Sequence, residues 1–579
     1  MVLCGWLDKQ RDHGKGVFID LRDRYGRTQL LMDSQSPPEV LDTVRQLRSE
    51  FVLRATGVVQ PRPTGQENPA LSTGQIEVHV QELEILNECP VPPFLPSASE
   101  LPNEELRLKY RYLDLRRAAM QRTLIQRGNI VKTIRDYFHE HQFVDIETPI
   151  LGRSTPEGAR DYLVPSRVHP GEFYALPQSP QIYKQLMMIA GYDRYVQVAR
   201  CFRDEDLRAD RQPEFTQLDM EMSFVDADDV MAMIDGLMQR LARDILGLDL
   251  KLPLPRMTYD EAMRRFGHDA PDLRFGMEII DCTPWAASCE FRVFRGAVDA
   301  GGWVRALNIP KAAEYLTRKR IDELTTFVQQ DFGAKGLAWM RCEADGTWQS
   351  PIVKNFSESQ LAALRELTQS QPGDVVLFVA DSWETSCKAL YGLRRRLGAE
   401  LKLYDPQQMS FSWVVEFPMF AFDAESQTWA AMHHPFTAPL ARDVDKLSSD
   451  PGAVRAQAYD LVINGYEAGG GTIRIHQSDI QAQVFGLLGM SPDEARHRFG
   501  FLLDALAYGA PPHGGIALGI DRIVMIFLGL DNIRDCLAFP KTQKAQDLMT
   551  DAPNQVETRQ LTELGIQTAN SKPQISATS

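Results

Sequence analysis

The sequence predicts a multidomain α+β/β protein, in which a small N-terminal β-barrel is tethered to a larger domain built on an antiparallel sheet. Three observations support this. Short alternating runs fill the first 88 residues, a charged loop near residue 210 joins two further strand-like runs, and an α+β segment separates these from a later return of β alternation. A chain of 579 residues is long enough for several such domains.

Residues 1–88 are expected to form the barrel. Five strand-like runs and one short helical pattern, at 38–50, fit a Greek-key barrel of the OB type. The runs are 2–7, 16–21, 29–32, 51–59 and 75–86. The proline-rich stretch at 89–103 is expected to be an extended linker.

The larger domain is expected to begin at 104. Charged helical patterns at 106–117 and 123–141 lead into a short strand that stops at Pro149. The composition then changes between Met257 and Tyr404, and β alternation returns at 411–421. The helical patterns in the middle segment are 311–332 and 357–370, and its strand patterns are 336–341 and 374–380.

The most informative stretch is the charged loop at 202–215, which lies between strand-like runs at 194–199 and 215–222. It is rich in arginine and acidic residues and contains no glycine, unlike an ordinary hairpin turn. Arginine side chains match phosphate and carboxylate oxygens in two-point geometry. Alone, the loop could equally be a solvated, salt-bridged connection.

Residues 514–525 run from a glycine-containing strand into an apolar helix and place Arg522 at the helix start. Glycine permits close approach of a ligand to the backbone, and a helix N-terminus favours phosphate. Taken singly, this is a weak signal.

Together, these segments resemble motifs 2 and 3 of class II aminoacyl-tRNA synthetases, and the helix, strand and proline before residue 150 resemble motif 1. The resemblance implies an OB-fold anticodon-binding domain, a class II catalytic domain and a homodimer formed through motif 1. The expected divisions are 1–88 (barrel), 89–103 (linker), 104–270 (first catalytic part), 271–404 (an inserted GAD-type α+β domain), 405–540 (second catalytic part) and 541–579 (C-terminal extension).

Four further segments, at 155–162, 178–184, 432–436 and 466–474, resemble bacterial-type aspartyl-tRNA synthetases. An acidic substrate side chain demands cations or donors, which Lys184, Arg474 and His433 can supply, and its ammonium group demands acceptors. In the family, the matching lysine and arginine bind the side-chain carboxylate. The aspartate-binding residues implied are Glu157, Ser179, Gln181, Ile182, Tyr183, Lys184, Arg203, Asp219, His433 and Arg474.

The resemblance also implies ATP as substrate and Mg²⁺ as cofactor. Arg203 is expected to bridge the α-carboxylate and α-phosphate, Phe215 to stack on adenine, Glu467 to bind magnesium, and Arg522 to hold the γ-phosphate; Arg203, Glu467 and Arg522 are the expected catalytic residues. The ATP-binding residues implied are Arg203, Asp204, Glu205, Gln212, Phe215, Glu467, Gly519, Ile520, Asp521 and Arg522.

Basic residues surround Phe18 in the expected barrel, as suits single-stranded bases. By resemblance, Arg11, Phe18, Gln29 and Glu77 contact the tRNA anticodon, although Phe18 could instead belong to the barrel core. His13 and Gly65 resemble the pattern of non-discriminating enzymes, which charge both tRNA(Asp) and tRNA(Asn). The chain starts directly at the first strand, without the short helical segment usual in the family, and catalysis should not depend on that segment.

Composition bounds the remaining possibilities. A formal net charge of -15 argues against non-specific binding to DNA or RNA, but a local basic face can still bind one shaped RNA. No apolar run approaches a membrane span and no secretory signal pattern is present, so a cytoplasmic protein is expected. The eight cysteines contain no C-x-x-C pair and are expected to be reduced packing residues.

For single motifs, purely structural alternatives remain. The pair His433–His434 could be a buried turn, residues 469–471 could be a flexible glycine turn, and Lys184 could lie at the surface. At the level of function, the alternatives are a ligase of the same subclass for asparagine or lysine, and a non-catalytic tRNA-binding paralogue. The latter would be expected to have lost Arg203, Glu467 or Arg522, and all three are present.

Overall fold

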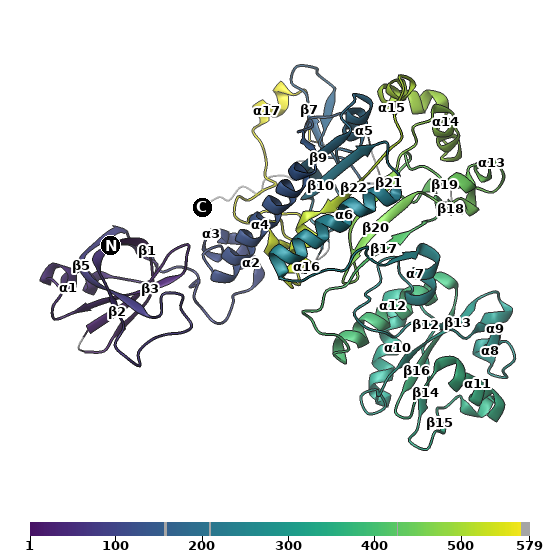
Figure 1. Cartoon of the computed structure of the whole chain (residues 1–579), viewed down its shortest axis with the longest axis horizontal. Helices are drawn as coiled ribbons and strands as arrows, with labels where there is room; N and C mark the ends of the chain where they lie inside the picture. The colour runs from purple at the N-terminus through teal and green to yellow at the C-terminus, as the bar shows by residue number, and fades with distance from the viewer. Residues whose placement is uncertain (15, 156–158, 208–209, 425–426, 569–579) are drawn as a thin grey trace, which may run out of the picture. The chain divides into compact units, whose positions relative to one another are not determined.

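The protein is described as a computed structural model, which covers residues 1–14, 16–155, 159–207, 210–424 and 427–568 (Figure 1). The chain divides into two compact units. Unit 1 consists of 1–128, 207–212 and 532–557, and unit 2 consists of 129–206, 213–531 and 558–579. Among the described residues, no helix is both long and apolar enough to cross a membrane.

Unit 1 begins with the expected five-stranded barrel, which is closed in the order β1-β2-β3-β5-β4. Inward-facing apolar residues of every strand, including Leu7, Ile19, Leu30, Leu53 and Val78, form one core. The first four strands are longer and the helix is shorter than predicted, whereas β5 has the predicted length shifted by one residue: β1 Val2–Asp12, β2 Gly16–Arg22, β3 Arg27–Asp33, α1 Pro38–Gln46, β4 Val52–Pro61 and β5 Ile76–Asn87.

Two short helices, α2 (Glu104–Lys109) and α3 (Arg111–Asp114), follow the linker in unit 1. The buried Arg111 donates hydrogen bonds to the carbonyls of Arg534, Leu537 and Ala538, 2.8 to 3.0 Å away. This guanidinium therefore joins the start of the larger domain to a segment more than 400 residues later in the chain.

Unit 2 contains an eight-stranded sheet in the order β11-β17-β20-β21-β22-β10-β9-β6. Its inner pairs, from β17 to β9, are antiparallel, whereas β11 and β6 pair in parallel at the two edges. The strands are β6 Val144–Asp145, β9 Arg194–Phe202, β10 Glu214–Ser223, β11 Arg256–Thr258, β17 Phe411–Val415, β20 Ala458–Ile463, β21 Tyr466–Ile473 and β22 His513–Gly519. Both predicted strands beside the charged loop are confirmed as β9 and β10.

Helices of unit 2 cover this sheet and place residues at its edges. The helices are α4 Ala118–Glu140, which starts in unit 1, α5 Gln181–Ile189, α6 Ala227–Leu241, α7 Tyr259–Phe266, α14 Ser478–Leu487, α15 Pro492–Ala507 and α16 Ile520–Phe527. Helix α6 begins with a capping box at Asp226 and Asp229 and buries Val230, Ile234 and Leu237.

A second, five-stranded sheet forms the inserted module, in the order β12-β13-β16-β14-β15. Residues of α10 and α12 join one apolar core with this sheet, and residues of α8, α9 and α11 join another. Its elements are β12 Ile279–Asp281, α8 Thr283–Ala286, α9 Arg292–Asp299, β13 Trp303–Ile309, α10 Arg318–Phe332, β14 Ala338–Cys342, β15 Trp348–Gln349, α11 Glu358–Thr368, β16 Val375–Asp381 and α12 Trp383–Glu400. Helices α10 and α11 fall within the predicted patterns, but α10 starts seven residues later because Thr317 caps it.

All eight cysteines are free thiols. Six are buried, as expected of packing residues, whereas Cys4 is exposed and Cys89 is half-buried.

Candidate active site

A closed charge network lies where α5 meets β10, β21 and β22. The ammonium Nζ of Lys184 donates to Asp219 Oδ1 at 3.0 Å and lies 3.5 Å from Glu221 Oε2. Arg474, just after β21, donates to both oxygens of Glu221, at 2.8 and 3.1 Å. All four side chains are at most 2% exposed.

Secondary structure explains this placement. Asp219 and Glu221 are two residues apart on β10 and therefore point to the same face of the sheet. Lys184 lies in the first turn of α5, where its amide donates to the carbonyl of Pro180 at 2.9 Å. Ile182 holds that turn by packing in a cluster with Phe436 and Phe485. Lys184 is therefore a buried residue and not a surface one.

The network contains two cations and two carboxylates. Burial opposes ionisation of Glu221, but Arg474 and Lys184 outweigh it and lower the pKa of this carboxyl. Burial raises the pKa of Asp219, an effect that Lys184 only partly offsets, and Arg203 is close enough to contribute in the same direction as Lys184. Glu221 is therefore the ionised counter-ion of Arg474. Asp219, the partner of Lys184, takes up a proton more readily than Glu221 does.

The histidine pair lies against this network. His434 Nε2 is 2.7 Å from Arg474 Nη1, which is always a donor, so this nitrogen must accept. Burial lowers the pKa of His434 well below its ordinary value, and burial also lowers the pKa of His433 to about 4. Both imidazoles are therefore neutral at pH 7, so of the two roles expected from sequence, cation or donor, His433 can fill only that of a neutral donor in this state.

Several buried polar atoms near the network have no hydrogen-bond partner among the described residues. They include Gln181 Nε2, Asp219 Oδ2 and His433 Nε2. Buried polar groups nearly always have partners, and exceptions are typical of sites that bind ligands. A donor on α5, an acceptor on β10 and a histidine near Arg474 together provide what an amino acid's carboxylate and ammonium groups require.

Three residues that were predicted to bind the substrate aspartate remain: Ser179, Tyr183 and Glu157. Ser179 Oγ accepts from the amide of Gln181 at 3.2 Å and so shapes the start of α5, on which Tyr183 also lies. Glu157 lies outside the described residues.

Several predicted nucleotide residues lie on or just after β9, β10 and β21 and at the start of α16, a region that we call the nucleotide edge. The Arg203 guanidinium lies 5.0 Å from the ring centroid of Phe215, across the β9–β10 hairpin. Arg522, in the first turn of α16, donates to the carbonyl of Glu467. Since β10 pairs with β22, and the Thr216 amide donates to Asp521 Oδ2 at 3.0 Å, the start of β10 and the start of α16 lie side by side.

Other predicted nucleotide residues have structural contacts. Ile520 and Asp521 are buried, and Asp521 ties α16 to β10. In unit 1, Gln212 donates to the carbonyl of Lys541 at 3.1 Å and accepts from its amide at 2.8 Å. Asp204 is exposed, and its amide donates to the carbonyl of Arg160 at 3.1 Å; Glu205 is also exposed.

Asp460 on β20 is a candidate that the sequence reasoning missed. It is 9% exposed, and its Oδ1 has no partner among the described residues. Burial raises its pKa well above the ordinary range, and the nearby charges of Glu467 and Asp269 add to this. An isolated Asp in an apolar strand was the available signal, because a buried carboxylate needs a cation or a donor.

The pair Asp460 and Glu467 fits a magnesium ion. Mg²⁺ is typically held by one or two carboxylates together with substrate phosphates, so a larger cluster is not required. Two carboxylates that repel each other without a cation, one exposed and one buried, match this pattern.

The glycines of β21 and β22 make room for protein atoms. A Cβ at Gly469, Gly470 or Gly471 would come within 2.1, 2.5 and 2.4 Å of Ala517 O, Asp460 Oδ1 and Gly515 O, respectively. The triple glycine is therefore part of a tightly packed strand and not a flexible turn. Gly515 likewise leaves space for Glu221, whose Oε2 would lie 2.1 Å from a Cβ there.

The barrel of unit 1 carries the predicted anticodon residues on one polar face. Arg11 donates to Asp20 Oδ1 at 2.7 Å, and Gln29 donates to Glu77 Oε2 at 2.8 Å. Phe18 is half-buried and lies outside the core cluster, with its ring centroid 5.6 Å from that of His13. Gly65 has a φ of +84°, which favours glycine.

A β-barrel followed by a class II-type antiparallel sheet with paired arginine and carboxylate sites defines an aminoacyl-tRNA synthetase architecture. Residues 103–543 match the family model "tRNA synthetases class II (D, K and N)", and residues 1–86 match "OB-fold nucleic acid binding domain". The chain therefore belongs to the class II aminoacyl-tRNA synthetases of the aspartate, lysine and asparagine group. This confirms the predicted fold class and its ligase class.

The relatives are more specific. The chain is 62% identical over 576 residues to the aspartate–tRNA(Asp/Asn) ligase of Rhodopirellula baltica, covering 99% of this chain and 97% of that protein. It is 51% identical over 569 residues to the aspartate–tRNA ligase of Bacillus licheniformis, covering 98% and 96%. The predicted resemblance to bacterial aspartyl-tRNA synthetases is confirmed.

Solved structures support the same fold. The asparaginyl-tRNA synthetase of Pyrococcus horikoshii, in complex with asparaginyl-adenylate, superposes with a TM-score of 0.57 at 20% identity and covers 94% of each chain.

Proposed function

We propose that this protein activates L-aspartate with ATP and transfers the aspartyl group to the 3′-terminal adenosine of tRNA(Asp) and tRNA(Asn). The observation that carries the proposal is the buried network of Lys184, Asp219, Glu221 and Arg474, with unpartnered polar atoms beside it. Its relatives named as aspartate–tRNA(Asp/Asn) ligases support the same reading.

The network favours an acid over its amide. Lys184 and Arg474 can only donate hydrogen bonds, so two carboxylate oxygens satisfy both of them. Asparagine would direct an NH₂ group at one of these donors, and a buried donor facing another donor is unfavourable. The substrate ammonium would bind Asp219, whose Oδ2 lacks a partner among the described residues.

Activation requires an oxygen of the substrate α-carboxylate to attack the α-phosphorus of ATP in line, which releases diphosphate and forms aspartyl-adenylate. The tRNA hydroxyl then attacks the carbonyl carbon, and AMP leaves. In this scheme Arg203 neutralises charge at the α-phosphate, Phe215 supports adenine, and Arg522 binds the terminal phosphate.

Glu467 and Asp460 would hold Mg²⁺, which supplies positive charge to the triphosphate when bound. Arg522 donates to the carbonyl of Glu467, so the same arginine fixes the backbone that carries this carboxylate. No side-chain nucleophile is required.

On the tRNA side, Arg11, Phe18, Gln29 and Glu77 would contact the anticodon. His13, which lies edge-on to Phe18, and Gly65 would allow either anticodon. We place this activity in the cytoplasm.

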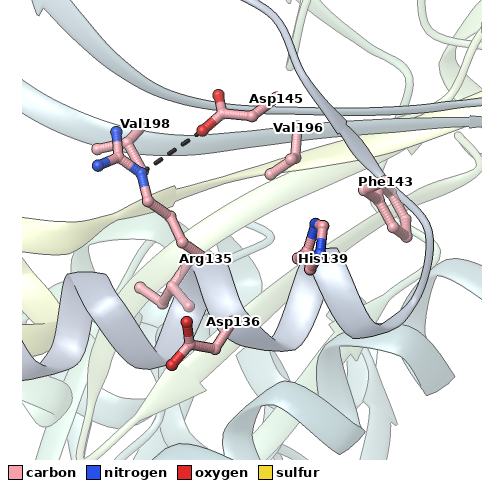
Figure 2. Close-up of a pocket in the computed structure, with 8 residues that line it drawn as sticks. Arg135, Asp136, His139, Phe143, Asp145, Val196 and Val198 are labelled. Carbon is pink, nitrogen blue, oxygen red and sulfur yellow. Dashed lines mark ion pairs between the residues drawn. The ribbon is translucent and has the colours of Figure 1, made fainter.

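A homodimer through motif 1 completes the proposal. Beside α4, β6 and β9, a cavity of about 290 Å³ is lined by Arg135, Asp136, His139, Phe143 and Asp145, among others (Figure 2). Arg135 Nε lies 3.5 Å from Asp145 Oδ2. The apolar residues Val144, Ile150 and Leu151 nearby are 45, 43 and 51% exposed, as suits a surface that a second copy covers.

Exchange of labelled pyrophosphate into ATP tests the amino acid. We expect exchange with aspartate; exchange with asparagine or lysine instead would support another member of the subclass, and none would support a non-catalytic paralogue. Charging of purified tRNA(Asp) and tRNA(Asn) side by side then tests the tRNA range, and efficient charging of tRNA(Asp) alone would remove the dual specificity. Sedimentation velocity tests the dimer.

A further inference from the structure

The inserted module contacts the hairpin that carries the two ATP-side carboxylates. Arg395, on α12, lies with its guanidinium carbon 5.7 Å from the ring centroid of Tyr466 and 5.8 Å from that of Tyr391. Tyr466 is the first residue of β21 and directly precedes Glu467. Since side chains alternate along a strand, fixing the Tyr466 ring on one face orients Glu467 toward the other.

The turn of the same hairpin also rests on the chain that leads into the module. Gly465, with a φ of +80°, approaches Asp272 so closely that a Cβ at this position would lie 2.9 Å from Asp272 Cβ. Arg394, the neighbour of Arg395, donates to the carbonyls of Asp272, Phe275 and Gly276 at 2.7 to 2.9 Å. Two adjacent residues of α12 therefore contact both partners: Arg395 contacts Tyr466 of the hairpin, and Arg394 binds the carbonyl of Asp272.

A third contact lies beside Asp269, whose charge acts on the other carboxylate, Asp460. His268 stacks on Tyr391 at 4.2 Å with an interplanar angle of 18°, and its Nδ1 lies 3.1 Å from Asp269 Oδ1. The Asp269 charge in turn acts on Asp460. The module thus touches the surroundings of both members of the pair.

We propose that Arg395 is a positioning residue for adenylate formation: it holds Tyr466 and thereby fixes Glu467 for the nucleotide. The inserted module then serves the ATP side of the active site through one turn of α12. This inference rests on the proposed function, because it assigns Glu467 to the nucleotide.

The test is a double-mutant cycle of Arg395→Ala and Tyr466→Leu. An exposed cation–π contact is worth about 0.5–1 kcal/mol, which corresponds to roughly a two- to fivefold effect. We expect each single variant to raise the KM for ATP and the half-saturating Mg²⁺ concentration in aspartate-dependent exchange by that factor, with the KM for aspartate unchanged. Because Arg395 acts through Tyr466, the double variant should be no worse than the worse single variant; additive effects would overturn the proposal.

Hydrogen exchange supplies a readout that does not depend on turnover. Arg395→Ala should accelerate amide exchange in residues 464–468, and Arg395→Lys should restore part of the protection. Arg396→Ala is the matched control, because Arg396 pairs with Glu400 at 3.0 Å and packs over Phe327; it should leave exchange rates and kinetics unchanged. Unchanged protection in Arg395→Ala, or an equal effect of Arg396→Ala, would contradict the inference.

The two levels of failure are distinguishable. If the wild-type protein shows no aspartate-dependent pyrophosphate exchange, the proposed function fails. If the wild type is active and the Arg395 and Tyr466 variants match it in ATP and Mg²⁺ dependence, only the positioning role fails.

Discussion

The amino-acid niche, which is the network of Lys184, Asp219, Glu221 and Arg474, differs from the nucleotide edge in the burial and pairing of its charged side chains. In the niche, Lys184, Glu221 and Arg474 are buried and already paired with one another. At the nucleotide edge, Glu467 is exposed, Arg203 and Arg522 are half-buried, and an aromatic ring and a backbone carbonyl are among their partners.

The difference follows from what each ligand requires. A small amino acid must be distinguished from its amide, and rigid, desolvated groups discriminate best because mismatched partners stay unpaired. A triphosphate brings several charges of its own, so half-exposed cations suffice to hold it. Substitutions should therefore affect stability in the niche and mainly activity at the nucleotide edge.

The largest effect is expected from Lys184→Met. It leaves two buried carboxylates without their ammonium partner, so we expect a loss of about 3 kcal/mol or more in unfolding free energy. Aspartate-dependent exchange should fall by on the order of a thousandfold in kcat/KM. Urea denaturation and exchange kinetics measure both. The control is Lys388→Met, because the side chain of Lys388 is 64% exposed. An unchanged KM for aspartate in Lys184→Met would contradict the assignment of Lys184 to amino-acid binding.

Glu467→Gln should separate the two regions. Exchange activity should fall by roughly a hundredfold, because one charged ligand near the triphosphate is lost, while the melting temperature stays unchanged. Differential scanning fluorimetry beside the kinetic assay checks this, with the exposed Glu384→Gln as control. A marked destabilisation would mean that the nucleotide edge is as tightly built as the niche.

Acid should weaken the fold through the histidine pair. The folded-state pKa of His433 is about 4 against an ordinary 6.5, so the unfolded chain binds the proton more readily. The resulting stability is complete above about pH 6.5 and is lost as the pH falls toward 4, by up to about 3 kcal/mol. His434 acts in the same direction. Urea midpoints across this window measure the slope, which His433→Gln should reduce; an equal slope in that variant would contradict the assignment.

The smallest effect is expected in the barrel. His13→Leu removes a ring nitrogen near Phe18, and we expect the ratio of tRNA(Asn) to tRNA(Asp) charging to fall by roughly fivefold, corresponding to about 1 kcal/mol. Aspartate-dependent exchange without tRNA should not change. Parallel aminoacylation assays measure the ratio, and an unaltered ratio would remove His13 from tRNA selection.

Local patterns predicted where the chemistry lies, but not how its charges are balanced. The β9 and β10 strands around the charged loop, Lys184 on a helix start and Arg522 in the first turn of α16 could all be read from short-range signals. The ion pair of Glu221 with Arg474 could not, because it joins residues more than 250 positions apart, and the isolated acid Asp460 in an apolar strand marks a position without indicating which charges face it. The neutrality of His433 also depends on tertiary burial, which local sequence does not encode.

The three adjacent glycines of β21 limit how this enzyme could be redesigned. Each faces an atom that leaves no room for even a methyl group, and that atom belongs to a backbone carbonyl or to Asp460. Larger side chains therefore cannot be introduced at these three positions without displacing neighbouring atoms. A new amino-acid preference would have to arise from substitutions elsewhere in the site.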